Sequence, residues 1–137
     1  VEIPPPPAMT DKTIARGRVL YEELQCVKCH GEDGAGRGSA PVDELRDALG
    51  RVVRPRDFTR GLYKSGRTQR DLYRTFVTGL DGSPMPSYAA SMEADDVYAL
   101  VHYLLDLERG RGLWDWLSVA PTWFEPSEQR VRRSSEG

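Results

Sequence analysis

Five consecutive residues constrain the fold of this chain more than any other feature of its sequence. The segment Cys26-Val27-Lys28-Cys29-His30 holds both cysteines of the 137 residues and one of the two histidines. A structural zinc site needs four ligands, and outside this segment the sequence offers only His102. A thioredoxin-like dithiol belongs in a βαβ unit, and no strand pattern is visible. A disulfide across two residues would close too small a loop to stabilise much.

The Cys-x-x-Cys-His spacing is typical of covalent haem attachment. Two thiols about one helical turn apart can add to the two neighbouring vinyl groups of a porphyrin, and the next residue can present its imidazole to the iron. We therefore predict one covalent haem c, with Cys26 and Cys29 as thioether attachments and His30 as an axial ligand of the iron.

The second axial position has several candidates. Met85 lies in Gly82-Ser83-Pro84-Met85-Pro86, where the two prolines stiffen the loop. A loop methionine is most often core packing, but 55 residues beyond His30 and between prolines we favour ligation. His102 is expected to be a surface or boundary histidine, off the apolar stripe of its helix. The other candidates are Met9, Met92 and the lysines.

Helical patterns occupy three parts of the chain, after a leader or linker at 1–9 whose four prolines predict polyproline II. The first helix follows Thr10 as N-cap. A second is capped by Thr68 with Asp71 and stopped by Gly79. A third runs from about Ser91 to Leu107. The residues predicted to form the apolar faces are Ile14, Gly17, Leu20, Tyr21, Leu24, Leu72, Tyr73, Phe76, Val77, Val97, Leu100, Val101, Leu104 and Leu107.

The remaining segments read as loops. Four glycines between 31 and 39 exclude regular structure, 51–67 shows no period, and 80–87 contains two prolines. A short helix is expected over 43–49, stopped by Gly50. No alternating pattern is long enough for a strand. The predicted class is all-α, with three main helices, a short helix and long functional loops.

The length is that of one domain, which excludes a large multidomain enzyme, and the net charge of −2 argues against a nucleic-acid binder. No apolar run approaches the roughly 18 residues needed to cross a bilayer, and no signal-peptide pattern is visible, so we expect a soluble, mature or trimmed form. Basic residues concentrate in one block, either a solvated surface or a collar for an anionic group: Arg46, Arg51, Arg54, Arg56, Arg60, Lys64, Arg67, Arg70 and Arg74.

On these motifs the chain resembles a class I c-type cytochrome, in particular the small bacterial monohaem type, from about Thr10 to Leu107. The haem-binding segment with the following glycine loop, the Met85 loop and Leu100-Val101-His102-Tyr103-Leu104 carry the resemblance. It implies the class I cytochrome c fold around one covalent haem, with His30 and Met85 as axial ligands.

The resemblance also assigns supporting residues by position. Pro41 matches the proline whose carbonyl accepts a hydrogen bond from the ligand histidine. Tyr88 falls near the aromatic that shields the methionine side. In this fold the loop that carries Arg56 passes the haem propionates, so Arg56, with Lys64 or Arg67, is the hypothesised carboxylate partner.

A haem sealed between histidine and methionine implies one-electron transfer and not catalysis. The expected partner is a redox protein, such as a membrane oxidase, reductase or dehydrogenase complex, with no nucleic acid and no small-molecule substrate. Because haem is attached outside the cytoplasm in this family, a periplasmic or extracytoplasmic location is expected, with an N-terminal tether as an option. The alternative is a haem sensor or peroxidase-like protein in which Met85 leaves the iron.

The segment 108–137, beyond the 10–107 domain, contains all three tryptophans, Trp114, Trp116 and Trp123. Such a tail either packs back on the domain or serves as a docking segment, since interfaces favour tryptophan and arginine.

Overall fold

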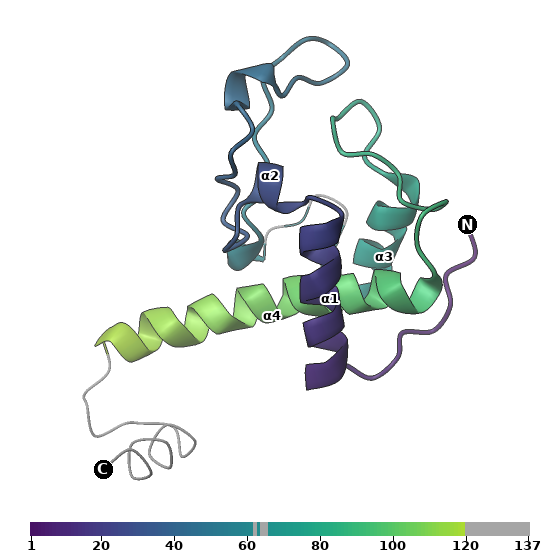
Figure 1. The fold of residues 1–137 in the computed structure, drawn as a ribbon, viewed down its shortest axis with the longest axis vertical. Coiled ribbons are helices and arrows are strands. Elements are labelled where there is room, and N and C mark those ends of the chain that lie inside the picture. The colour runs from purple at the N-terminus through teal and green to yellow at the C-terminus, as the bar shows by residue number, and fades with distance from the viewer. Residues whose placement is uncertain (62, 64–65, 120–137) are drawn as a thin grey trace.

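Helix α4 (Ala94–Val119) is the element against which the two other long helices, at 11–23 and 69–78, pack (Figure 1). The computed structural model describes residues 1–61, 63 and 66–119, and for 110–119 it describes the backbone alone. α4 supplies the most deeply buried side chains of the core, Val97, Tyr98, Leu100, Val101 and Leu104, none more than 2 % exposed. Their three- and four-residue spacing places them on the inner side of one helix.

Helix α1 (Asp11–Glu23) crosses α4 at a glycine. A Cβ added to Gly17 would lie 2.0 Å from the carbonyl oxygen of Ala99, so only a glycine lets the two backbones approach this closely. Beside the crossing the rings of Tyr21 and Tyr103 meet edge to face, with centroids 5.3 Å apart. Gly17 and Tyr21, both predicted for the apolar face of this helix, are buried.

Two threonine caps set where α1 and α3 (Gln69–Thr78) begin. The Thr10 side chain accepts a hydrogen bond from the Thr13 backbone N–H, and the Thr13 hydroxyl oxygen accepts one from the Thr10 backbone N–H. Thr68 and Asp71 make the same reciprocal pair at α3. Each pair satisfies backbone donors that have no partner within the helix. Both predicted caps are confirmed.

The prediction of a short helix over 43–49 is wrong. A single 3-10 turn, η1 (Val42–Glu44), is followed by an isolated antiparallel bridge between Arg46 and Val52. The Asp47 carboxylate accepts the backbone N–H groups of Leu49 and Arg51. That local bonding competes with a helix and favours a turn.

His102 also differs from expectation. Its side chain is fully buried, not at a boundary. Nδ1 lies 2.8 Å from the Thr13 hydroxyl oxygen of α1, and Nε2 lies 3.0 Å from the Gln69 side-chain oxygen of α3. The imidazole therefore connects three helices, and burial lowers its pKa.

The all-α class is confirmed, with no strand in the described part of the chain. The last helix begins three residues later than predicted and continues beyond Leu107 to Val119. The described helices include none long and apolar enough to span a membrane. The side chains of Trp114 and Trp116, and the whole of Trp123, lie outside the described part, so both hypotheses for the tail remain predictions.

Candidate functional site

A single helical turn carries the predicted haem-binding residues. α2 (Val27–His30) follows α1 after a break at Gln25, a non-glycine residue with φ of 61°. The His30 N–H donates to the carbonyl of Cys26 at 2.9 Å, and Gly31, with φ of 81°, ends the turn. Both cysteines are half-buried, and burial raises the pKa of the Cys26 thiol to about 11. The turn thus presents Cys26, Cys29 and His30 from one rigid segment.

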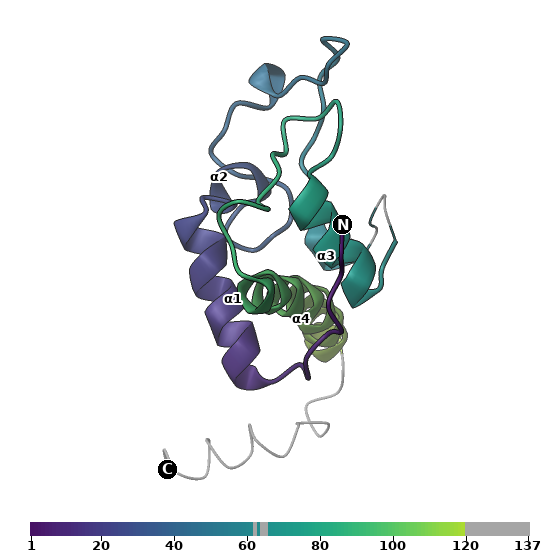
Figure 2. The same cartoon turned by 90° about the vertical axis from the view of Figure 1, so that its right-hand side faces the viewer.

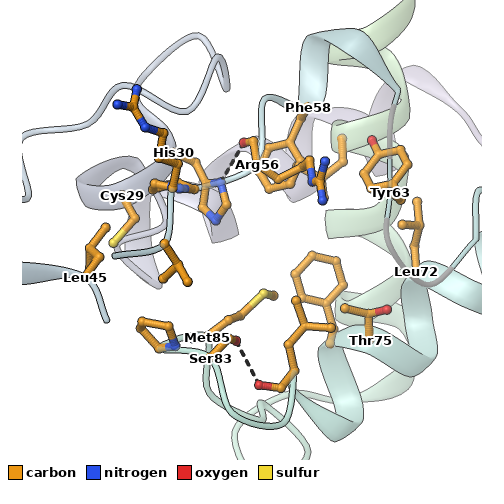
Figure 3. Close-up of a pocket in the computed structure, with 17 residues that line it drawn as sticks. Cys29, His30, Leu45, Arg56, Phe58, Tyr63, Leu72, Thr75, Ser83 and Met85 are labelled. Carbon is orange, nitrogen blue, oxygen red and sulfur yellow. Dashed lines mark hydrogen bonds between the residues drawn. The ribbon is translucent and has the colours of Figure 1, made fainter. Parts of the chain in front are cut away.

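The His30 ring is fixed by two contacts from one loop. Its Nδ1 lies 3.0 Å from the backbone carbonyl oxygen of Arg56, and its plane stacks on Phe58 with centroids 4.3 Å apart (Figure 3). Burial lowers the pKa of the imidazole, and the Arg56 carbonyl partly offsets this. A neutral ring that donates from Nδ1 keeps the lone pair of Nε2 for a metal.

The carbonyl predicted for this contact, that of Pro41, is the wrong one. Pro41 caps η1, where its carbonyl accepts the N–H of Glu44 at 3.1 Å. The loop that contains Arg56 reaches the histidine because it packs on the glycine loop. Phe58 N–H donates to the Gly34 carbonyl at 2.8 Å, and a Cβ on Gly36 would lie 2.7 Å from the Pro55 carbonyl oxygen.

A largely apolar cavity of about 170 Å³ opens beside His30 and Cys29. Figure 3 shows Met85 on the opposite side, with its sulfur directed toward the side that carries His30. Side chains from four separate segments supply the apolar lining, among them Leu45, Val53, Phe58, Leu72, Leu80 and Leu104. The structure thus brings the two predicted axial ligands, 55 residues apart in sequence, to one cavity.

A second cavity, of about 90 Å³, shares His30, Cys29 and Met85 with the first and adds Cys26 and Tyr88. Tyr88 is half-buried, its ring meets Phe76 edge to face, and burial raises its pKa. Tyr88 and Met85 line this cavity together, and the shielding role expected of Tyr88 stays a prediction.

The Met85 loop is fastened to α3 and to a neighbouring loop. Tyr88 N–H donates to the carbonyl of Phe76 at 2.9 Å, and the Ser87 hydroxyl donates to the carbonyl of Val77 at 2.5 Å. On the other side of the loop, the Ala48 N–H donates to the Gly82 carbonyl at 2.7 Å. These bonds fix the backbone of the loop that carries Met85.

Tyr63 is a site residue that the sequence did not reveal. Its side chain lines the larger cavity, and its hydroxyl is the one buried side-chain polar atom without a hydrogen-bond partner in the described part of the chain. Burial raises its pKa to about 12, so it remains a donor. The aperiodic loop around it gave no signal. A buried, unpaired phenol calls for an acceptor.

Three cationic side chains were predicted as partners of the haem carboxylates. Of these, Arg56 lines the cavity, whereas Arg67 is paired with Glu108 and is not among the lining residues. Lys64 lies outside the described residues.

The residues present fit a covalently attached haem. Two thiols stand one turn apart, an imidazole and a thioether share the cavity, and the walls are apolar. The Tyr63 hydroxyl and the Arg56 guanidinium are donors suited to the carboxylates that a haem carries.

Comparison with known proteins adds independent findings. A model of the family described as Cytochrome c matches residues 14–108. A chain from the reducing HAO-like protein complex of Kuenenia stuttgartiensis has a similar structure, with a TM-score of 0.75 and 41 % sequence identity. The similarity covers 78 % of this chain and 49 % of that chain, so this chain spans about half the length of the chain from the complex. Comparison with curated proteins finds no match.

Proposed function

Because the chain belongs to the cytochrome c family, which makes it a haem-based electron-transfer protein, we propose that it carries one covalent haem c ligated by His30 and Met85. The observation that supports this most directly is that Met85 and His30 line the same apolar cavity, with Cys29 beside the histidine. Cys26 and Cys29 are the proposed thioether attachments.

The bound haem would supply an iron that gains and loses one electron. The protein's own part is to hold the ligands. The Arg56 carbonyl and the Phe58 ring orient His30, and the bonds from α3 orient Met85. The largely apolar walls of the cavity would limit the contact of both ligands with water. A ligand set that is rigid before and after electron transfer needs little rearrangement, and this favours fast exchange. The soft thioether favours the reduced metal and raises the potential relative to bis-histidine ligation.

Replacing Met85 by alanine tests this ligation. We expect the M85A holoprotein to lose the methionine-to-iron charge-transfer band of the ferric spectrum, to bind carbon monoxide when reduced, and to have a lower midpoint potential. M92A is the matched control, because Met92 packs against the core but is not a cavity residue. A wild-type protein that lacks the band and binds carbon monoxide would instead support the sensor or peroxidase-like alternative.

For the partner we propose a redox protein, an oxidoreductase complex in particular. The support is that the similar solved chain is part of a reducing HAO-like protein complex. We further propose a periplasmic or extracytoplasmic location, where haem attachment in this family takes place. Size-exclusion chromatography of the native extract, followed by redox titration of the fraction that contains the haem peptide, tests the association. Elution only at the mass of the free chain would contradict it.

A further inference from the structure

The proline-rich segment at the N-terminus is partly buried. Residues 1–9 are extended, and in Figures 1 and 2 they run beside α3 and the first turns of α4. Ile3 is half-buried and packs against the hydrophobic core, whereas Pro5, Pro6 and Pro7 are exposed. Within this segment, the packing against the core is thus made by Ile3 and not by the last three prolines.

Two side chains bind the backbone of this segment. The Tyr98 hydroxyl donates to the Pro4 carbonyl at 2.5 Å, and the Arg70 guanidinium donates to the Ile3 carbonyl at 3.4 Å. Tyr98 belongs to α4 and is 1 % exposed, whereas Arg70 belongs to α3. The Tyr73 ring of α3 lies 4.7 Å from the Tyr98 ring. One short segment thus contacts donors from both helices.

We propose that Tyr98 and Arg70 form an intramolecular binding site for an extended proline-type segment, occupied by Ile3 and Pro4, which acts as a strap across α3 and α4. The chemistry suits such a ligand. A polyproline segment makes no internal hydrogen bonds, so its carbonyls are free acceptors, and its stiffness lowers the entropy lost on binding. Aromatic rings with a polar tip are the usual partners of such segments.

The strap has a consequence for the cavity. α3 supplies Leu72, Thr75 and Phe76 to its wall and holds the Met85 loop through the carbonyls of Phe76 and Val77. A looser α3 would therefore loosen Met85. This last step rests on the proposed function, whereas the strap itself does not.

A double-mutant cycle in the full-length holoprotein tests the strap. Y98F removes only the hydroxyl, and I3A removes the apolar anchor. We expect each to raise the unfolding equilibrium constant by about fivefold, and the two together to raise it by clearly less than the product, because either one releases the same segment. The matched control is V19A, which truncates an exposed residue of α1, and its effect should multiply with that of Y98F. Independent, multiplying effects of I3A and Y98F would overturn the strap.

Amide hydrogen exchange separates the strap from the ligation. In I3A we expect the amides of α3 to exchange several-fold faster at Leu72 to Phe76, with those of α1 unchanged. Unchanged α3 exchange would also overturn the strap. If the α3 amides exchange faster in I3A but the protein has no methionine-to-iron band, the strap is supported and only the Met85 ligation is refuted.

Discussion

The imidazole of His30 lies against the phenyl ring of Phe58, with the ring centroids 4.3 Å apart and the planes inclined by 24°. Two residues earlier in the chain, the Arg56 carbonyl contacts Nδ1 of the same imidazole. The orientation of the proposed axial ligand is thus set by one short loop outside the Cys-x-x-Cys-His segment.

Replacing Phe58 by leucine should release one of these two constraints. We expect F58L to destabilise the holoprotein by about 1–2 kcal/mol and to change the hyperfine-shifted NMR resonances of the ligand histidine, because the ring can then rotate. F76L is the control. Phe76 is equally buried and lines the same cavities but has no ring contact with His30, so F76L should lose stability with little change in those resonances.

Replacing Arg56 by leucine tests the proposed carboxylate contact. The substitution removes the guanidinium and leaves the backbone carbonyl that binds His30. We expect a lower acidity of the haem propionate and a shifted midpoint potential, because a charge-assisted hydrogen bond is lost. R67L, which removes a guanidinium paired with Glu108, should leave the potential nearly unchanged. An unchanged potential in R56L would exclude the Arg56 guanidinium as a partner of the haem carboxylate.

Replacing Tyr63 by phenylalanine has two opposite expected results, depending on whether the hydroxyl has an acceptor. An unpaired buried hydroxyl is costly, so its deletion would be neutral or stabilising. If the phenol donates to a haem carboxylate, Y63F should instead destabilise the holoprotein by about 1.5–3 kcal/mol. We expect this destabilisation, measured by chemical denaturation. A more stable Y63F holoprotein would contradict the contact.

A methyl group at Gly17 should separate the two helices that cross there. We expect G17A to cost about 1–3 kcal/mol, because the added Cβ overlaps the Ala99 carbonyl and one of the backbones must shift. The control is G50A, where φ is also unfavourable for alanine at 75° but nothing lies within 4 Å. Its cost should stay near ~1 kcal/mol. Equal costs in thermal or denaturant unfolding would mean that the crossing tolerates a shift.

His102 should make stability depend on pH. Burial holds its folded-state pKa below the ordinary 6.5, so the unfolded chain takes up a proton first as the pH falls. This contribution is complete above about pH 6.5 and is lost progressively below it. H102Q should therefore show a flatter decline of unfolding free energy between pH 7 and pH 5 than the wild type. Q69A, which keeps the buried imidazole, should retain the decline, and equal slopes in H102Q and the wild type would exclude His102 as the cause.

The sequence predicts those parts of the molecule that depend only on residues close together in the chain. The helical turn that carries Cys26 and His30 is indicated by residue spacing, and the caps at Thr10 and Thr68 by side chains three residues apart. The acceptor for His30 could not be found this way. It is a backbone carbonyl, which any residue supplies, and packing of the glycine loop decides that it is the carbonyl of Arg56 and not that of Pro41.

Two further differences from the sequence-based predictions have separate physical causes. His102 falls off the apolar stripe of its helix, yet α1 and α3 cover it with a hydroxyl and an amide that satisfy both ring nitrogens. The residues 43–49 have adequate helical pattern, but Asp47 bonds the backbone ahead of it and turns the chain back. Tyr63 could not be identified from the sequence. Its hydroxyl is notable only because it is buried without a hydrogen-bond partner, and this is a property of the folded loop.

The central position of α4 has a consequence for how the protein unfolds. The strap, α1, α3 and the short helix η2 (Phe58–Arg60) all rest on that one helix, and through α3 and η2 so do the segments that carry Met85 and orient His30. Global unfolding of this arrangement is expected to be cooperative, because each of these segments loses its packing when α4 unfolds. Helical circular dichroism and the methionine-to-iron charge-transfer band should therefore be lost, and tyrosine fluorescence should change, along a single denaturation curve.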